Sequence, residues 1–315
     1  MKDIVVGVSS SNVEGLVTYK GQVYFVADDT KAGKELWSSD GSSSGTTLLV
    51  DIHPGPISAW PQQLTVYKEW LYFSADHGGD GCGADLQQLC GRELWKTDGV
   101  ASRTHRFIDV ATGAPSGDPK DLIIYNNLLY FSAFDVLHGR ELWVTDGETP
   151  AGNGFPNAHI VVDIYPGVGN ANPSEIIVFN RQLYFAATDG LHGTELWKSD
   201  GTAIGTSLVK DINPGAASSY PASLALYGCL LYFAALKPAY GVELWRSNGY
   251  SEGTALLKDI FESSYSSNPS GLFLFNNILF FSATDNIYGN ELWRTDGTID
   301  GTFLFKDLNT GSPDS

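Results

Sequence analysis

The chain has 315 residues, 43% of them hydrophobic, and a formal net charge of −17 at pH 7. That length suits two ordinary domains or one large all-β domain. The negative charge argues against a nucleic-acid partner, because phosphates call for Lys and Arg, and against anionic membrane surfaces. No apolar run approaches the roughly 18 residues of a membrane-spanning helix, so membrane insertion is not expected.

The N-terminal stretch "MKDIVVGVSSS" lacks the basic and apolar regions of a signal peptide. We therefore expect either an intracellular protein or a chain that is a mature or excised piece of a longer one. The stretch opens with "MKDI", a fragment of a repeat that fills the rest of the chain.

That repeat is marked by a Gly-x-Glu-Leu-Trp motif, with intervals of 58, 48, 54, 48 and 48 residues between its glutamates. The two longer intervals are 48 residues plus an insertion, one around Cys82 and Cys90 and one within residues 147–159. The motif supplies Glu35 and Trp37, Glu93 and Trp95, Glu141 and Trp143, Glu195 and Trp197, Glu243 and Trp245, and Glu291 and Trp293.

One whole unit, residues 221–260, contains four short strands, "SLALY", "LLYFAAL", "ELWRS" and "TALLKDI". A two-residue turn joins the first two strands, with Asn126-Asn127 or Asn276-Asn277 at this point in other units. Asn-Asn suits a turn whose two central residues both take a positive φ. Short strands separated by regular turn signals indicate an all-β fold, and no window has a helical period.

Six units of four strands, about 48 residues each, predict an all-β, six-bladed β-propeller with four antiparallel strands per blade. We expect residues 1–315 to form a single domain, with six blades between about Val13 and Leu308. A β-solenoid is the alternative fold, although its coils usually repeat at about half this length or less.

The repeated Glu and Trp are expected to be structural, because a site used once needs its residues once. Strand alternation puts Glu195 and Trp197 on one face and Leu196 on the other. The tryptophan is expected to wedge between neighbouring sheets. The glutamate, if buried, needs hydrogen-bond donors, which we expect from the adjoining blade.

The stretches "ELWKSDGTAIGTSLVKDINPG" and "ELWRTDGTIDGTFLFKDL" resemble the ELWxxDGT repeat family, tandem repeats found mostly in large secreted or surface-associated bacterial proteins. The resemblance covers nearly the whole chain, although Asn248 replaces the motif aspartate and the second unit departs from the pattern. It implies a propeller-like module that is extracellular or at the cell surface, with no catalytic motif to transfer.

The "KDI" segment occurs seven times against six of every other strand, because residues 1–6 carry a spare partial strand. Three interpretations stay open. The segment closes the ring beside the last blade, it is the remnant of a longer repeat array, or it pairs with the edge of another subunit.

Cys82 and Cys90 close a short inserted segment, and we expect a local disulfide between them, which implies an oxidising compartment. Cys229 is left as a free thiol in a predicted turn.

The search for catalytic motifs is negative for nucleophile elbows, phosphate-binding loops and zinc-binding signatures. No metal site or cofactor is expected. Calcium is a weak secondary expectation, because "TDGTIDGT" lacks the alternating ligands of an EF-hand. A glycosidase would need a pair of carboxylates that 36 acidic residues could supply but that the sequence does not locate.

Positions that vary within the constant repeat are the candidate ligand site. Some precede the motif glycine, in the loop between the second and third strands. Others precede the proline that ends the crossing between blades. The loop and the crossing are expected to open onto the same face of the propeller. Two interpretations stay open for these positions: the His and Tyr side chains cap their loop, or the aromatic and imidazole side chains form a rim suited to sugar stacking. The members of that rim are Trp60, His138, His192, Tyr220, Tyr240 and Tyr288.

The sequence therefore predicts a non-enzymatic extracellular structural or protein-interaction module, with protein partners or self-assembly into a larger surface or filament assembly. A lectin that binds glycans through the rim is the second hypothesis, and a glycoside hydrolase or lyase is the third.

Overall fold

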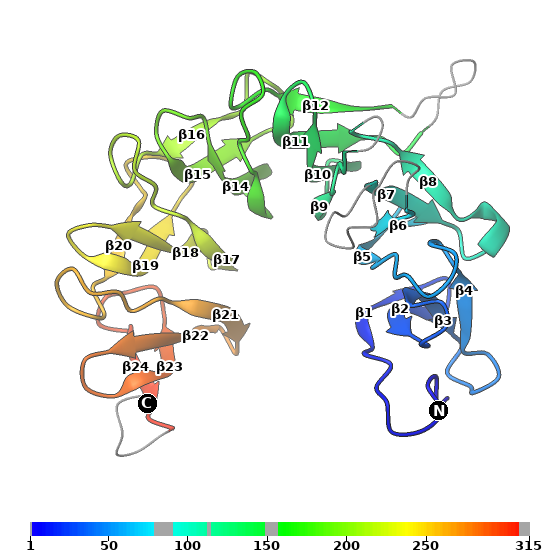
Figure 1. Cartoon of the computed structure of the whole chain (residues 1–315). Helices are drawn as coiled ribbons and strands as arrows, with labels where there is room; N and C mark the ends of the chain where they lie inside the picture. Colours follow the sequence, from blue (N-terminus) through cyan, green and yellow to red (C-terminus); the bar gives the residue numbers. More distant parts are fainter. Residues whose placement is uncertain (1, 79–90, 112–114, 149–156, 309–315) are drawn as a thin grey trace. The chain divides into compact units, whose positions relative to one another are not determined.

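The computed structural model of the chain describes residues 2–78, 91–111, 115–148 and 157–308. Its contacts divide into two compact units, Met1–Ile160 and Val161–Ser315, which we describe separately. The described residues form six antiparallel sheets of four strands, and in each sheet the strands follow one another in sequence order (Figure 1). The predicted all-β, six-bladed β-propeller with four strands per blade is confirmed.

The first unit contains three sheets. The first sheet has β1 (Glu14–Tyr19), β2 (Gln22–Asp28), β3 (Lys34–Ser39) and β4 (Thr47–Val50). The second has β5 (Gln62–Tyr67), β6 (Trp70–Asp76), β7 (Arg92–Thr97) and β8 (His105–Ile108), with a 3₁₀ turn at Ala101–Arg103. The third has β9 (Lys120–Tyr125), β10 (Leu128–Asp135), β11 (Gly139–Thr145) and β12 (Ala158–Val162), whose last residues cross into the second unit.

The second unit contains the other three sheets. The fourth sheet has β13 (Ser174–Phe179), β14 (Gln182–Thr188), β15 (Thr194–Ser199) and β16 (Ser207–Lys210). The fifth has β17 (Ala222–Tyr227), β18 (Leu230–Lys237), β19 (Gly241–Ser247) and β20 (Ala255–Lys258). The sixth has β21 (Ser270–Phe275), β22 (Ile278–Asp285), β23 (Gly289–Thr295) and β24 (Phe303–Lys306).

Each sheet has two distinct apolar faces, because side chains alternate along its strands. One, the tyrosine face, carries the tyrosine of the second strand and the leucine of the motif, such as Tyr232 and Leu244. The other, the tryptophan face, carries the phenylalanine of the second strand and the motif tryptophan, such as Phe281 and Trp293.

The core of each unit is made by packing these faces against each other. The tyrosine face of the first sheet packs on the tryptophan face of the second, and the second packs likewise on the third. In the second unit the fourth sheet packs on the fifth and the fifth on the sixth in the same way. A sheet therefore buries its apolar residues by stacking on a neighbour, as repeat folds require.

The turns follow the sequence chemistry. Asn126 and Asn127 both have positive φ, at 46° and 59°, as predicted for the turn between the first two strands. The motif glycine is required for two reasons: its φ is positive, and another backbone segment lies too close to leave room for a Cβ atom. At Gly193, where φ is +66°, an added Cβ would lie 2.5 Å from the carbonyl oxygen of Ala217.

The "DGT…GT" part of the repeat is a locked turn. Asp200 Oδ1 accepts hydrogen bonds from the Thr202 amide at 2.9 Å and the Thr202 hydroxyl at 2.7 Å, and that hydroxyl oxygen accepts one from the Gly205 amide at 3.0 Å. Ser199 and Thr206 join their hydroxyls across the base of the turn at 2.7 Å. The carboxylate thus serves the turn, as Asp side chains commonly do.

Residues 2–6 form no strand, so the spare partial strand predicted for residues 1–6 is absent over this part. The described residues contain no helix long and apolar enough to cross a membrane.

Candidate functional site

The motif glutamates are buried ties within each repeat. Glu195, which is fully buried, accepts hydrogen bonds from the amides of Ile212 at 3.0 Å and Ser219 at 2.9 Å, and from the Ser219 hydroxyl at 2.6 Å. These donors lie in the segment that follows the fourth strand of the same sheet. We expected donors from the adjoining blade; the structure places them in the segment that crosses from the fourth sheet to the fifth and folds back over the carboxylate.

Burial changes the ionisation of these carboxylates because it disfavours the charged form. It raises the pKa of Glu35 to about 8 and that of Glu93 to about 7, and it also raises the pKa of Glu195 and Glu243. Glu141 is also fully buried and Glu291 nearly so, which leaves none of the six open to a substrate.

The motif tryptophans lie in the stacked faces. Trp143, Trp245 and Trp293 belong to the clusters between sheets, Trp95 packs at the edge of one, and Trp37 packs with Phe25 on the first sheet. Trp197 is also buried. Trp143, Trp245 and Trp293, with Trp95 at the edge of its cluster, have the wedge-like position between sheets that the sequence predicts.

The two predicted rim segments lie side by side within a repeat. In the fourth sheet, the Thr194 amide donates to the Ser218 hydroxyl at 2.8 Å, and the Tyr220 amide donates to the Thr194 carbonyl at 3.1 Å. These bonds bring the loop that carries His192 next to the crossing that carries Tyr220. The first sheet joins its segments in the same way, through Lys34 and Trp60.

The rim histidines are held by aspartates of their own loops. His192 Nδ1 lies 2.7 Å from Asp189 Oδ2, and His138 Nδ1 lies 2.9 Å from Asp135 Oδ2. The hydrogen bond to Asp189 raises the pKa of His192. Both imidazoles therefore cap a loop, which is a structural role that leaves them partly exposed.

Trp60 and Tyr220 differ from the other crossing residues in one respect. All residues at this position have left-handed backbone, and Asn or Asp occupies it at Asp118, Asn172 and Asn268, with φ between 42° and 49°. Trp60 and Tyr220 adopt φ of 50° and 49°, which is unfavourable for a bulky side chain. Both rings are exposed, at 40% and 65%.

Tyr240 and Tyr288 occupy the position of His192 in the fifth and sixth sheets. Tyr240 ends a turn, with its amide donating to the Lys237 carbonyl at 2.8 Å, and the Tyr288 amide donates to Asp285. Their rings are 36% and 42% exposed.

Sequence reasoning missed a set of cations next to the motif glycine. This position holds Lys34, Arg92 and Arg140 in the first unit and Thr194, Val242 and Asn290 in the second. Arg92 is buried and donates to the carbonyls of Trp60 at 2.7 Å and Ala59 at 3.3 Å, while Lys34 Nζ lies 4.3 Å from the centre of the Trp60 ring. These cations fix the crossing segment, and comparison of the six repeats could have found them.

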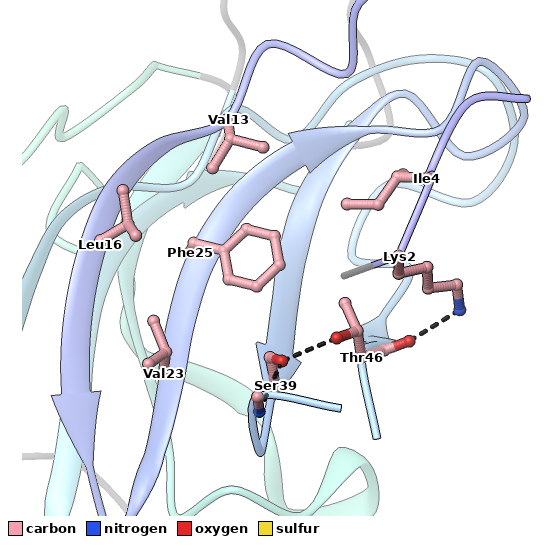
Figure 2. Close-up of a pocket in the computed structure, with 9 residues that line it drawn as sticks. Lys2, Ile4, Val13, Leu16, Val23, Phe25, Ser39 and Thr46 are labelled. Atoms are coloured by element: carbon pink, nitrogen blue, oxygen red, sulfur yellow. Dashed lines mark hydrogen bonds between the residues drawn. The ribbon is translucent and has the colours of Figure 1, made fainter. Parts of the chain in front are cut away.

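A pocket of about 430 Å³ opens on the tryptophan face of the first sheet. Figure 2 shows Phe25 directed into it, with Leu16 and Val23 on one side and Ile4 on the other. At this face of the other sheets the residue equivalent to Val23 is fully buried, as Leu71 is in the second sheet. Leu16 is 68% exposed, so the face is partly open.

The N-terminal segment contacts this face as the end of a preceding repeat would. Lys2 Nζ donates to the Thr46 carbonyl at 2.7 Å, and Lys210 makes the same bond to the Thr254 carbonyl at 2.8 Å between the fourth and fifth sheets. Ile4 packs against the cluster of Phe25 and Trp37 (Figure 2). The segment has no strand but keeps the contacts of one.

The tyrosine face of the sixth sheet is exposed and has changed in composition. Phenylalanine replaces tyrosine or smaller residues there, and we call this surface the phenylalanine face. Its members are Phe273, Phe275, Phe280, Phe303 and Phe305. Four are exposed, Phe273 at 65%, Phe275 at 56%, Phe305 at 50% and Phe303 at 43%.

The predicted disulfide partners Cys82 and Cys90 lie outside the described residues. Cys229 is an exposed free thiol in the turn between β17 and β18. No group of three or more His, Cys, Asp or Glu side chains that could hold a metal ion occurs within the described ranges.

No family model matches the chain, and no curated protein matches it. Solved structures are similar to it in fold. A puromycin hydrolase matches with a TM-score of 0.57 at 13% identity, over 99% of this chain and 48% of that one. A prolyl endopeptidase matches with a TM-score of 0.55 at 12% identity, over 96% and 42%.

A computationally designed protein, Ika8, matches with a TM-score of 0.51 at 14% identity, over 98% of this chain and 77% of that one. This chain spans less than half the length of the two enzymes. At these identities the likeness concerns the fold alone.

Proposed function

We propose that the chain is a non-enzymatic protein-interaction module of the cell exterior, and that its binding surface is the phenylalanine face of the sixth sheet. The observation that carries the proposal is the exposure of four phenylalanines on one sheet face. Clustered apolar side chains exposed on a folded domain mark an interaction surface more often than scattered ones do.

The change of residue type supports an intermolecular role. Between the fifth and sixth sheets, the Tyr227 hydroxyl donates to the Asn277 carbonyl at 2.9 Å, and the Tyr67 hydroxyl donates to Asn127 at 2.7 Å between the second and third. Phe275 stands at this position in the sixth sheet and has no hydroxyl to donate. Phe179 also lacks the hydroxyl at this position and packs in the core between the fourth and fifth sheets, so the apolar character of the sixth face rests on Phe273, Phe303 and Phe305 as well as on Phe275.

An extracellular location rests on the resemblance to ELWxxDGT repeats. The absence of a catalytic role is supported by the burial of the motif glutamates and by the use of Asp135 and Asp189 to hold the rim histidines.

The test compares two phenylalanines of the same sheet. Phe281→Ser, on the buried tryptophan face, should lower the free energy of unfolding by about 3–5 kcal/mol. Phe273→Ser, on the phenylalanine face, should lower it by less than about 1 kcal/mol, because that ring is already in solvent. Equal losses in denaturant titrations of the dilute chain would mean that the phenylalanine face is covered core, and the proposal would fail.

Glycan binding is a second candidate, favoured by the left-handed backbone of Trp60 and Tyr220. Strained residues persist where they are needed, and exposed rings of this kind can stack on sugars. A glycan array with the wild-type chain and with Tyr220→Asn tests it. Binding that the substitution leaves unchanged would exclude Tyr220 from the site.

A further inference from the structure

Four exposed tyrosines lie at one end of the three sheets of the second unit, and we call them the loop tyrosines. They lie in the loops between the second and third strands of a sheet or in the segments that cross to the next sheet. Both kinds of segment are at the same end of a sheet, because its strands are antiparallel and follow one another in sequence order. The loop tyrosines are Tyr220, Tyr240, Tyr265 and Tyr288, with exposed fractions of 65%, 36%, 62% and 42%.

Backbone hydrogen bonds join these segments from one sheet to the next. The Leu236 amide, near the end of β18, donates to the Ser219 carbonyl at 2.7 Å, next to Tyr220. The Thr284 amide, near the end of β22, donates to the Ser267 carbonyl at 2.8 Å. Each bond links a crossing segment to the start of the loop in the following sheet. The loop tyrosines therefore form one row across the fourth, fifth and sixth sheets rather than separate patches.

The crossing segment after the fifth sheet departs from the repeat in a way that displays an aromatic ring. Phe261 and Tyr265 replace Asn213 and Ala217 of the preceding crossing, and their rings stack with centres 5.0 Å apart and planes at 23°. Phe261 is half-buried and Tyr265 is exposed. Phe261 therefore supports a flat aromatic surface that is open to solvent.

Both crossing segments in the row contain left-handed backbone at a residue other than glycine. Ser263 has a φ of +76° at the position where other crossings have Gly55, Gly167 or Gly215, and Tyr220 has a φ of +49°. Strained backbone of this kind gathers at functional sites. It supports a ligand-binding role for these two crossings.

The charges around the row disfavour an anionic ligand. The position next to the motif glycine, which holds cations in the first unit, holds Thr194, Val242 and Asn290 here. The loops and crossings contain five acidic residues, with His192 and one lysine, Lys237, as their basic residues. These segments are residues 188–193, 211–221, 236–241, 259–269 and 284–289.

Several of the acids already hold the loops together, so they are not free to pair with a cationic ligand. Asp189 binds His192, Asp259 accepts a hydrogen bond from the Ser263 amide at 3.3 Å, and Asp285 accepts one from the Tyr288 amide at 2.6 Å. An uncharged ligand therefore fits the row best.

We propose that the loop tyrosines bind an extended, uncharged polysaccharide, with contacts on each of the three sheets. A tyrosine ring packs on the C–H face of a sugar, and its hydroxyl can bond to sugar hydroxyls. Neighbouring sheets stack about 10 Å apart, which is close to the length of two sugar units in an extended chain. Extended peptides commonly pair with the edge of a sheet, and the loop tyrosines lie outside the strands. This site goes beyond the protein-interaction role and rests on the glycan-binding candidate, to which it gives a ligand class.

Calorimetric titration of the whole chain with sugars of increasing length tests the site. The probes are β-1,4-linked oligomers of glucose, mannose and N-acetylglucosamine, from the single sugar to the hexamer, with heparin as the anionic comparison. We expect the association constant of at least one uncharged series to rise about tenfold or more with length, because each added unit reaches a further part of the row.

Two tyrosines of the fifth repeat provide the variant and its matched control. Tyr265→Ala should weaken binding of the hexamer about tenfold, and Tyr265→Phe, which keeps the stacked ring, should retain most of it. Tyr250 is 64% exposed but lies in the turn after β19, at the opposite end of the fifth sheet. Tyr250→Ala should therefore leave binding unchanged.

Length-dependent binding that Tyr265→Ala weakens and Tyr250→Ala does not would support the proposal. Failure of every uncharged oligomer to bind, tighter binding of heparin, or equal losses in the two alanine variants would overturn it. A single sugar bound as tightly as its hexamer, with loss on Tyr220→Asn, would overturn the extended site and leave the glycan-binding candidate standing. The stability of Phe273→Ser tests the protein-interaction role separately.

Discussion

Glu35 shows why a residue repeated six times need not be catalytic. Its carboxylate accepts hydrogen bonds from the backbone amides of Ile52 and Ala59, each at 3.0 Å, and is fully buried. Removing such a group would leave buried donors without acceptors, which is costly to a fold. Its conserved chemistry within the chain is therefore that of a structural tie.

The ionisation of these glutamates predicts how stability depends on pH. The pKa of Glu35 rises from 4.5 to about 8 on burial and that of Glu93 to about 7, so the folded state binds more protons than the unfolded state between these values. Stability should then fall as pH rises from 4.5 towards 8. The raised pKa of His192 acts in the same direction.

Urea titrations across this pH window check the prediction. Glu35→Gln should show a shallower decline than wild type, because one of the contributing groups no longer titrates. Stability that rises steadily with pH over the window would show that the carboxylates are ionised in the fold.

Most substitutions lower the free energy of unfolding, but we expect Tyr220→Asn to raise it. Tyr220→Asn places at φ +49° the residue type that Asn172 and Asn268 already supply. Relief of left-handed strain should raise the free energy of unfolding by on the order of 1 kcal/mol. Chemical denaturation measures this, with Asn268→Tyr expected to lose a similar amount. A destabilised Tyr220→Asn would show that the ring makes contacts that outweigh the strain.

At the scale of elements, the locked turn after the third strand of the fourth sheet requires a glycine at position 205. A Cβ added at Gly205 would collide with the Asp200 carboxylate. Gly205→Ala should therefore lower the free energy of unfolding by about 1–3 kcal/mol.

The double variant Asp200→Ala with Gly205→Ala separates the collision from other causes. Removing the carboxylate relieves the clash, so the double variant should lose less than the sum of the two single losses. Additive losses, measured by thermal unfolding, would mean that the turn opens to accommodate the alanine.

Strands and turns were predictable because their signals are local. The alternation in "ELWKSD" assigns Leu196 and Trp197 to opposite faces, and the structure places them in that way. Asn126-Asn127 predicts a turn with two positive φ values, which the backbone has. The donors to Glu195 were not predictable, because they depend on how the crossing segment folds back over the sheet.

In the candidate sites, too, features with a local sequence signal were predictable and features that depend on contacts in the folded chain were not. The neighbourhood of His192 and Tyr220 follows from the repeat, but the aspartates that hold the rim histidines had to be seen in place. The change from tyrosine to phenylalanine at Phe275 and Phe280 is visible in the sequence. Its meaning depends on knowing which face each ring occupies and that this face is exposed.

At the scale of the whole molecule, the residues that recur in every repeat pack the sheets together, and the residues that depart from the repeat are the candidates for binding. The second and fifth sheets have both faces covered within their units, and the sixth sheet, whose tyrosine face departs from the repeat, has exposed phenylalanines there. On this account the chain interacts through the phenylalanine face of its sixth sheet rather than through the six repeated motifs.

The free energy of unfolding of Phe273→Ser and of Phe281→Ser, measured by denaturant titration of the dilute chain, tests this account most directly. We predict a loss of less than about 1 kcal/mol for Phe273→Ser, whose ring is exposed, and of about 3–5 kcal/mol for Phe281→Ser, whose ring is buried. Equal losses would contradict the account, because the phenylalanine face would then be covered core.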